Sequence, residues 1–192
     1  VAGIAAASSN NNEGISGICW NCTIMPLRAG SNGILTVSNV VQSIHYAVDN
    51  NATIISMSFG GNDSQSVQSA ITYAYNKGVL LVAAAGNEGI NSKQYPCAYN
   101  EVICVSATDK SDNLASYSNF GEWVDIAAPG SSILSIIPNN AYTEMSGTSM
   151  ATPIIAGSIG LIRSLFPVNH TDLTKIFFST GAQKNLSNIT IN

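Results

Sequence analysis

Charge is scarce in this 192-residue sequence: Asp, Glu, Lys and Arg make up only 9% of it, and the formal net charge is −4. Seven Lys and Arg residues are spread thinly, without a basic run, which argues against nucleic-acid binding because a phosphate backbone is bound by clustered cations. The longest apolar run, residues 78–86, is far shorter than the roughly 20 residues that cross a bilayer, so no membrane span is expected. With 45% hydrophobic residues, the chain is also not disordered.

Cysteine and histidine are few as well, with four and two residues. Cys19 and Cys22 form a C-x-x-C, which fits a redox pair, half of a zinc site or a disulfide. A four-ligand zinc site needs a second close pair, whereas Cys97 and Cys104 stand seven residues apart with no histidine nearby. No metal site is therefore expected. Buried thiols or structural disulfides are favoured, and proximity favours the bridge Cys97–Cys104.

Glycosylation sequons give a weak indication of the compartment. Their number is little above what chance gives in an Asn-, Ser- and Thr-rich chain, but together with the cysteines they favour a glycosylated protein that is secreted or resides in a lumenal or vacuolar compartment. The sequons begin at Asn21, Asn51, Asn62, Asn169, Asn185 and Asn188.

Short apolar runs alternate with helical patterns along the chain, and no linker or repeat divides it. Residues 79–84 are apolar without alternation, which is typical of a strand covered on both faces. Gly78 is expected to end the helix before them, and Pro167 the long helix after Ser149. Such strand–helix order predicts one α/β domain with a largely parallel sheet and helices on both faces. The expected strands are residues 23–28, 53–58, 79–84, 102–107 and 123–126, and the expected helices are residues 37–48, 66–77, 149–165 and one capped by Thr171 or Asp172.

Three glycine-flanked segments, residues 57–61, 83–89 and 146–153, lie where α/β proteins place their ligand sites. Ser149 follows Gly-Thr and precedes a helix, so free N–H groups there would favour negative charge on a bound oxygen. Taken alone, a serine at this position is more often a simple N-cap. The segment is not the G-x-S-x-G turn of α/β-hydrolases, because Ala151 stands where that motif needs glycine.

The complete strings point to a known family. Residues 147–157 (GTSMATPIIAG) closely resemble the nucleophile motif of subtilisin-like serine proteases, and residues 82–89 (VAAAGNEG) resemble the oxyanion segment of that family. Residues 56–61 (SMSFGG) look like its substrate-binding strand, and residues 1–3 look like the end of its histidine motif. The resemblance covers essentially the whole chain. It implies a three-layer subtilisin-like α/β fold and serine endopeptidase chemistry.

The resemblance also implies site roles. Ser149 would be the nucleophile that forms an acyl-enzyme, and Asn87 would donate its side-chain N–H to the tetrahedral oxyanion together with the Ser149 backbone N–H. Without the resemblance, Asn87 would be interpreted as a turn residue. Glu88 would lie near the pocket mouth, or else be a solvated loop carboxylate. The implied substrate-binding residues are Ser58, Phe59 and Gly60 along an extended edge, with Ala84, Ala85 and Gly86 as walls of the P1 pocket.

The sequence departs from the family pattern because it shows no candidate for the catalytic base. A serine nucleophile needs a histidine and an orienting aspartate, yet His45 and His170 both stand in surface settings outside any such motif. The resemblance places the family histidine four residues before Val1 and the aspartate further upstream. We therefore expect residues 1–192 to be a single partial domain, incomplete at both ends and inactive alone. The alternatives are a pseudoprotease that binds peptide without cutting it and, less favoured, a purely structural α/β domain.

The remaining expectations concern ligands and partners. No cofactor is required by the chemistry. Residues 8–17 resemble the calcium-binding loop of the family, and they also read as an Asn- and Gly-rich turn. The expected partners are a protein or peptide substrate, with broad or bulky apolar P1 preference, and an inhibitory pro-segment of the kind common in the family.

Overall fold

The computed structural model describes residues 1–166 and 169–180 and centres on a parallel sheet. Its four strands pair in sequence order, β3-β4-β5-β6. Every residue of β4 and β5 is buried, as the unbroken apolar runs predicted for strands covered on both faces. The strands are β3 (Ile54–Met57), β4 (Leu80–Ala84), β5 (Val102–Thr108) and β6 (Ile126–Pro129).

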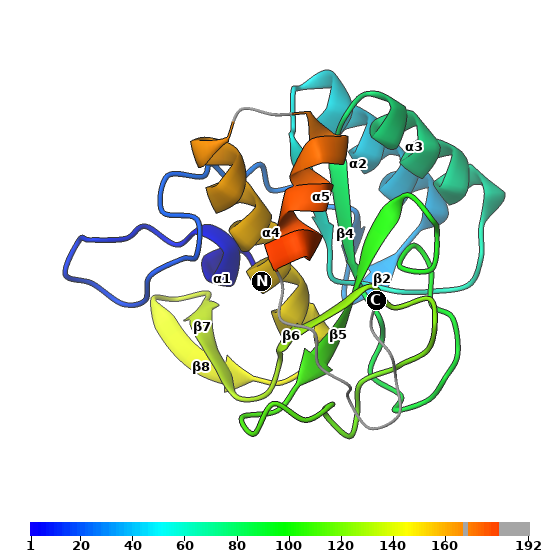
Figure 1. Cartoon of the computed structure of the whole chain (residues 1–192). Coiled ribbons are helices and arrows are strands. Elements are labelled where there is room, and N and C mark those ends of the chain that lie inside the picture. The colour runs from blue at the N-terminus through cyan, green and yellow to red at the C-terminus, as the bar shows by residue number, and fades with distance from the viewer. Residues whose placement is uncertain (167–168, 181–192) are drawn as a thin grey trace.

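Helices cover both faces of this sheet (Figure 1). Alternate residues of β4 point to opposite sides: Leu81 belongs to the core under α2 and α3, and Val82 to the core under α4 and α5. The expected three-layer α/β fold is confirmed. The helices are α1 (Ala2–Ala6), which packs on α4, and α2 (Val37–Asp49), α3 (Gln65–Asn76), α4 (Thr148–Leu165) and α5 (His170–Thr180).

Two small antiparallel hairpins, which the sequence patterns did not predict, complete the fold. Strands β1 (Gly30–Ser31) and β2 (Ile34–Leu35) form one, and β7 (Ile133–Ile137) and β8 (Ala141–Met145) form the other. The turn of the second hairpin holds Asn139 and Asn140 at φ of 67° and 53°. Asparagine tolerates this left-handed region better than most residues, so the two asparagines suit the conformation of this turn.

Two predicted strands differ from the structure. Residues 23–28 form no strand, because within the described part of the chain they have no ladder partner. The strand expected at residues 123–126 begins only at Ile126. Its first residues are in a turn, in which the Val124 N–H donates to Gly121 O at 3.1 Å.

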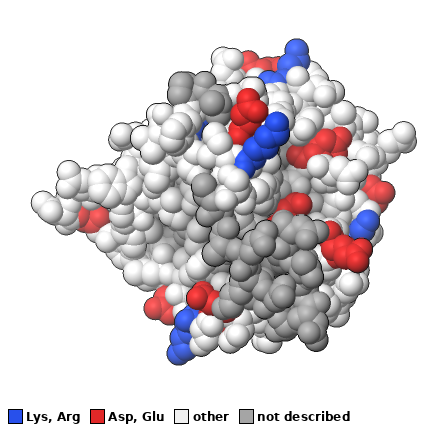
Figure 2. Space-filling model, in the orientation of Figure 1, with Lys and Arg blue, Asp and Glu red and all other residues white. Residues whose placement is uncertain are grey.

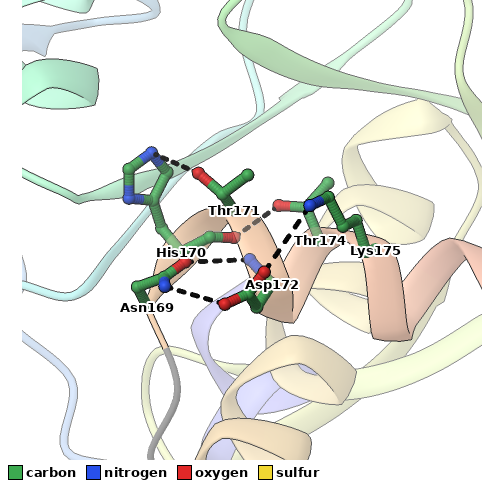
Figure 3. Close-up of polar contacts among 6 residues, drawn as sticks. All are labelled: Asn169, His170, Thr171, Asp172, Thr174 and Lys175. Atoms are coloured by element: carbon green, nitrogen blue, oxygen red, sulfur yellow. Dashed lines mark hydrogen bonds and ion pairs between the residues drawn. The ribbon is translucent and has the colours of Figure 1, made fainter.

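The N-terminus of α5 is also capped differently from the prediction (Figure 3). Asn169 Oδ1 accepts from the Asp172 N–H at 2.9 Å, and Asn169 Nδ2 donates to Asp172 Oδ2 at 2.8 Å. Asn169 is therefore the cap, rather than Thr171 or Asp172, because its oxygen accepts from the free N–H of the third residue of the helix. Gly78, at φ 81°, follows α3 as expected. Pro167, Asn185 and Asn188 lie outside the described residues.

The four cysteines form two disulfides, Cys19–Cys22 and Cys97–Cys104. The second confirms the bridge that proximity favoured. In the described residues no single helix is both long and apolar enough to cross a bilayer, and α4 with α5 would reach that length only as a pair bent by 112°. On the face drawn in Figure 2, charged side chains are sparse and the two signs are interspersed.

Candidate active site

The three glycine-flanked segments meet at the carboxyl edge of the sheet. Ser58 directly follows β3, Asn87 comes three residues after β4, and Ser149 is the second residue of α4. In an open parallel sheet this edge is where ligands bind. Residues that are up to 91 positions apart in sequence are thus brought into direct hydrogen-bonding contact.

Ser149 and Ser58 bind each other reciprocally. Ser149 Oγ donates to Ser58 O at 3.3 Å, and Ser58 Oγ donates to Ser149 O at 3.1 Å. The N-cap residue of α4 is Gly147, which has no side chain to cap the helix. Ser149 is therefore not the simple N-cap that its local sequence allowed: its hydroxyl points toward the end of β3 and is half-exposed.

Asn87 is fixed through its oxygen. Its Oδ1 accepts from the Thr148 N–H at 2.8 Å and from Thr148 Oγ1 at 3.0 Å. The buried Thr148 hydroxyl also accepts from the Gly86 N–H at 3.2 Å. With the oxygen occupied, the exposed Asn87 side chain presents its Nδ2 donor, which has no acceptor among the described residues.

The Asn87 side-chain amide and the Ser149 backbone nitrogen both lie close to Gly147. A Cβ placed on Gly147 would lie 3.5 Å from both Asn87 Nδ2 and Asn87 Oδ1, and 3.7 Å from the Ser149 backbone nitrogen. An amide donor and a helix N-terminus are thus neighbours, a combination that favours an anionic oxygen. The sequence singled out both residues, but only the fold places them side by side.

The predicted substrate edge lies beside a second segment of chain. Ser58 and Phe59 are half-buried and Gly60 is exposed. A Cβ on Gly60 would lie 3.2 Å from Oε1 of Gln94, a residue the sequence analysis did not single out. Gly61 and Tyr95 exchange two backbone hydrogen bonds, of 2.9 and 3.0 Å, which hold these two segments together.

The predicted pocket walls are largely backbone. Ala84 and Ala85 are buried, and the Ala85 side chain packs in the core under α2 and α3. Gly86 has a φ of 105°, and a Cβ there would lie 2.5 Å from Asn119 Nδ2. Only glycine fits this position, because both the backbone conformation and the space exclude a side chain.

Asn119 is a fully buried residue that the sequence analysis missed. Its Nδ2 donates to Ala85 O at 3.1 Å and to Glu88 Oε2 at 2.7 Å, and its Oδ1 accepts from the N–H groups of Glu88 and Ile90. It thereby shapes the loop that carries Asn87. The hydrogen bond from Asn119 Nδ2 also holds the carboxylate of the exposed Glu88. The sequence analysis had placed Glu88 either at the pocket mouth or in a solvated loop, and in neither case predicted this contact. No local signal marks this role, because the partners are about thirty residues away in sequence.

The two histidines lie on helices that flank the sheet. His45, on α2, has its ring 4.7 Å from that of Tyr73, and His170, on α5, contacts the Tyr75 ring at 5.0 Å. The shifted side-chain pKa values belong to Tyr73, Tyr99 and Asp125. The hydrogen bond to Asp49 raises the pKa of Tyr73, burial raises the pKa of Tyr99 to about 12, and burial raises the pKa of Asp125. Neither Ser149 nor Asn87 contacts a histidine in the described residues.

The loop of residues 8–17 uses some of its side-chain oxygens for bonds within the loop itself. Asn11 Oδ1 accepts from the Glu13 N–H at 3.1 Å, so this asparagine stabilises the turn. Within the described ranges, no group of three or more His, Cys, Asp or Glu side chains is placed to hold a metal ion. Calcium binding by this loop, through carbonyls and one asparagine as in the family loop it resembles, stays a prediction.

Comparisons with known proteins agree on one family. A family model described as "Subtilase family" matches residues 1–185. A thermophilic serine proteinase of Bacillus sp. (strain AK1) is 47% identical over 166 residues, which are 85% of this chain and 41% of the relative. Thermitase of Thermoactinomyces vulgaris is 47% identical over 165 residues, which are 85% of this chain and 59% of thermitase.

Solved structures give the same result. The chain superimposes on a Pseudoalteromonas arctica protease with a TM-score of 0.93 at 29% identity, covering all of this chain and 66% of that protein. It also matches PagA, a prenylagaramide maturation protease, with a TM-score of 0.82 at 30% identity over 89% of this chain and 68% of PagA. The chain thus spans only about half the length of the curated relatives above.

Proposed function

Because the chain belongs to the subtilase family, whose model matches residues 1–185, we propose that it carries the nucleophile and the oxyanion site of a serine endopeptidase. The observation that supports this most directly is the arrangement around Gly147. The Asn87 side-chain amide and the Ser149 backbone nitrogen both lie close to Gly147, at the start of the helix that carries the Ser149 hydroxyl. A structural serine would need neither donor.

In the proposed reaction, Ser149 Oγ attacks the scissile carbonyl carbon while a histidine base takes its proton. The carbonyl oxygen becomes an oxyanion that accepts from Asn87 Nδ2 and the Ser149 N–H. The C–N bond then breaks, the base returns the proton to the leaving amine, and an acyl-enzyme remains at Ser149. Water hydrolyses this ester by the same proton transfers in reverse order. Asn87 can act without reorganising because its Oδ1 is already held by Thr148.

The base itself is proposed to come from outside these 192 residues, together with its orienting aspartate. His45 and His170 sit against Tyr73 and Tyr75 on α2 and α5. The curated relatives extend well beyond the aligned part, since this chain spans 41% and 59% of the two described above. The protein that contains this chain is therefore the species in which activity should be measured.

Substrate binding is proposed along the edge formed by Ser58, Phe59 and Gly60, where a peptide backbone could pair as an added strand. Residues 84–86 would wall the P1 pocket, and Gln94 beside Gly60 would narrow it. Walls made mainly of backbone and small side chains favour a broad or bulky apolar P1 residue. Cleavage-site profiling with a peptide library would test this, and strict selection of basic P1 residues would contradict it.

A pro-segment that occupies the same edge until it is removed is also proposed, as is location outside the reducing cytosol. The second proposal is supported by the two disulfides, since such bonds persist in oxidising compartments. Treating the unprocessed protein with a trace of active enzyme and measuring the gain in activity would test the pro-segment. Fractionation of the native cell would test the compartment.

The deciding experiment compares peptide hydrolysis by the whole protein with that by its Ser149→Ala and Asn87→Ala variants, with Ser158→Ala as a matched control on α4. We expect hydrolysis that Ser149→Ala abolishes and Ser158→Ala leaves unchanged. If the unaltered protein binds peptide but forms no acyl-enzyme and releases no product, it is a pseudoprotease. Trapping the acyl-enzyme on Ser149 with a slowly hydrolysed ester, followed by mass spectrometry, separates these outcomes.

A further inference from the structure

The two disulfides lie in very different surroundings. Cys97 and Cys104 are 1% and 0% exposed, and both belong to the core under α2 and α3. Cys19 is 3% exposed, but its partner Cys22 is half-exposed, and the intervening Trp20 is 62% exposed. The Cys19–Cys22 pair therefore includes one residue that is partly open to solvent, whereas both residues of the other pair are buried.

The Cys19–Cys22 pair lies against the far half of α4. A Cβ on Gly160 would lie 2.8 Å from Cys22 Sγ and 3.3 Å from Cys19 Sγ, so the helix backbone contacts both sulfurs closely. One turn earlier, a Cβ on Gly157 would lie 3.0 Å from the Ile18 Cβ. The disulfide thus packs against Gly160 and Ile18 packs against Gly157, while Cys22 as a residue stays partly exposed.

The segment that carries the disulfide is also held by bonds that do not involve sulfur. The N–H groups of Gly17, Ile18 and Cys19 donate to carbonyls of α1 and its C-cap at 3.1, 3.1 and 2.9 Å. The disulfide closes a loop of only three residues' separation, so it constrains the unfolded chain less than a disulfide that closes a longer loop. Reduction should therefore leave the segment in place and the protein folded.

From these observations we propose that Cys19–Cys22 is a thiol–disulfide exchange site in the native protein: a dithiol that can close to a cyclic disulfide reduces it, and the disulfide form of that reagent re-forms it. A thiolate of the dithiol attacks Cys22 Sγ, the bond between the two cysteine sulfurs breaks, and Cys19 leaves as a thiolate. The second thiol of the dithiol, as its thiolate, attacks the mixed disulfide and releases Cys22. The dithiol is oxidised to its disulfide by two electrons, and its two protons end on Cys19 and Cys22.

The site is distinct from the proposed catalytic centre. Gly160 lies eleven residues beyond Ser149 on α4, about 16 Å along the helix axis. The exchange proposal therefore depends on neither the nucleophile nor the oxyanion donors. It can be tested in the Ser149→Ala background, in which self-cleavage does not complicate the measurement.

The test is stepwise reduction of the whole oxidised protein with dithiothreitol under native conditions, followed by alkylation and peptide mapping. We expect Cys19 and Cys22 to be labelled on the order of a hundredfold faster than Cys97 and Cys104, since the buried pair must await local opening. Circular dichroism should stay native, and oxidised dithiothreitol should restore the bond. Equal labelling rates for the two pairs, or loss of native structure as Cys22 is labelled, would overturn the proposal.

A substitution on α4 sharpens the test. Gly160→Ala places a methyl group against Cys22 Sγ and should raise the rate of reduction of Cys19–Cys22 several-fold, because a distorted disulfide is more easily reduced. Ser158→Ala, in the same helix, should leave the rate unchanged. If Gly160→Ala leaves the labelling rate of Cys22 unchanged, the sulfurs do not depend on this contact and the assignment fails. If Gly160→Ala does not fold, the comparison of the labelling rates of the two cysteine pairs in the protein that keeps Gly160 still tests the proposal.

Discussion

The two ends of α4 are held in place by different physics. At its N-terminus, directed hydrogen bonds to Asn87 and Ser58 fix Thr148 and Ser149. In its second half, Gly157 and Gly160 leave room for close packing because they have no side chains. Ile18 packs against Gly157, and the Cys19–Cys22 disulfide packs against Gly160. One helix is thus oriented by polar contacts where chemistry is proposed and by close van der Waals contact where it is anchored.

This contrast predicts how substitutions at each end of α4 should affect the protein. A hydrogen-bonded end fixes individual atoms to within tenths of an ångström, which matters where donors must meet a developing charge. A packed end fixes only the helix position, and it responds to added volume rather than to lost polarity. Substitutions at the first end should therefore affect the rate of catalysis, and those at the second should affect stability.

The largest effect is expected at Ser149. Ser149→Ala removes the proposed nucleophile and should lower kcat of the whole protein by about a millionfold, the order of loss that removing the nucleophile causes in subtilisin. Unfolding midpoints should stay close to the parent value, because Ser149 is half-exposed. Residual hydrolysis within tenfold of the parent protein would place the nucleophile elsewhere.

Asn87→Ala should come next. Losing one donor to the oxyanion lowers kcat by about 10² to 10³, a range that itself comes from subtilisin. The loss should fall on kcat with little change in KM, because the donor acts on charge that develops in the transition state. Steady-state kinetics on one peptide ester decides. A purely KM-based effect would mean that Asn87 only binds the substrate.

Thr148→Val tests whether Asn87 is positioned by its neighbour. The substitution removes the hydroxyl that bonds Asn87 Oδ1 and accepts from the Gly86 N–H, while the Thr148 N–H bond to Asn87 remains. We expect about a tenfold loss in kcat and a stability cost of about 1–3 kcal/mol. Thr152→Val is the control, since that equally buried hydroxyl donates only to Thr148 O inside the helix. Equal kcat losses in both variants would reduce the effect to general packing.

The smallest effect is expected for Gly160→Ala. It is an effect on stability, and its sign depends on whether the Cys19–Cys22 disulfide is oxidised or reduced. In the oxidised protein, Gly160→Ala should lower the melting temperature, because the new methyl group meets Cys22 Sγ. In the reduced protein Cys22 can turn outward, and the helix preference of alanine should then stabilise by about 1 kcal/mol. Gly157→Ala should destabilise in both states, because it meets the Ala5 carbonyl at 3.0 Å. Calorimetry with and without dithiothreitol checks the sign.

Local pattern was sufficient for the elements whose cause is local. The helical spacing from Val37 to Val48 predicted α2, and the unbroken run at residues 79–84 predicted the buried β4. Gly78 predicted the end of α3, since a positive φ favours glycine. The motif strings identified Ser149, Asn87 and the family by resemblance, because in them the order of residues along the chain carries the information.

Tertiary structure decided whatever depends on a partner distant in sequence. Asn119 shapes the Asn87 loop from about thirty residues away, and residues 23–28 form no strand because an apolar run becomes a strand only when it is paired. The amino-acid sequence by itself predicted the layers through periodicity and, through its motifs, the candidates for nucleophile and oxyanion donor. Only the fold brings the Asn87 amide and the Ser149 backbone together at Gly147 and buries both residues of one disulfide while leaving Cys22 of the other partly exposed. Convergence and burial are properties of three-dimensional contacts, which no local stretch of sequence contains.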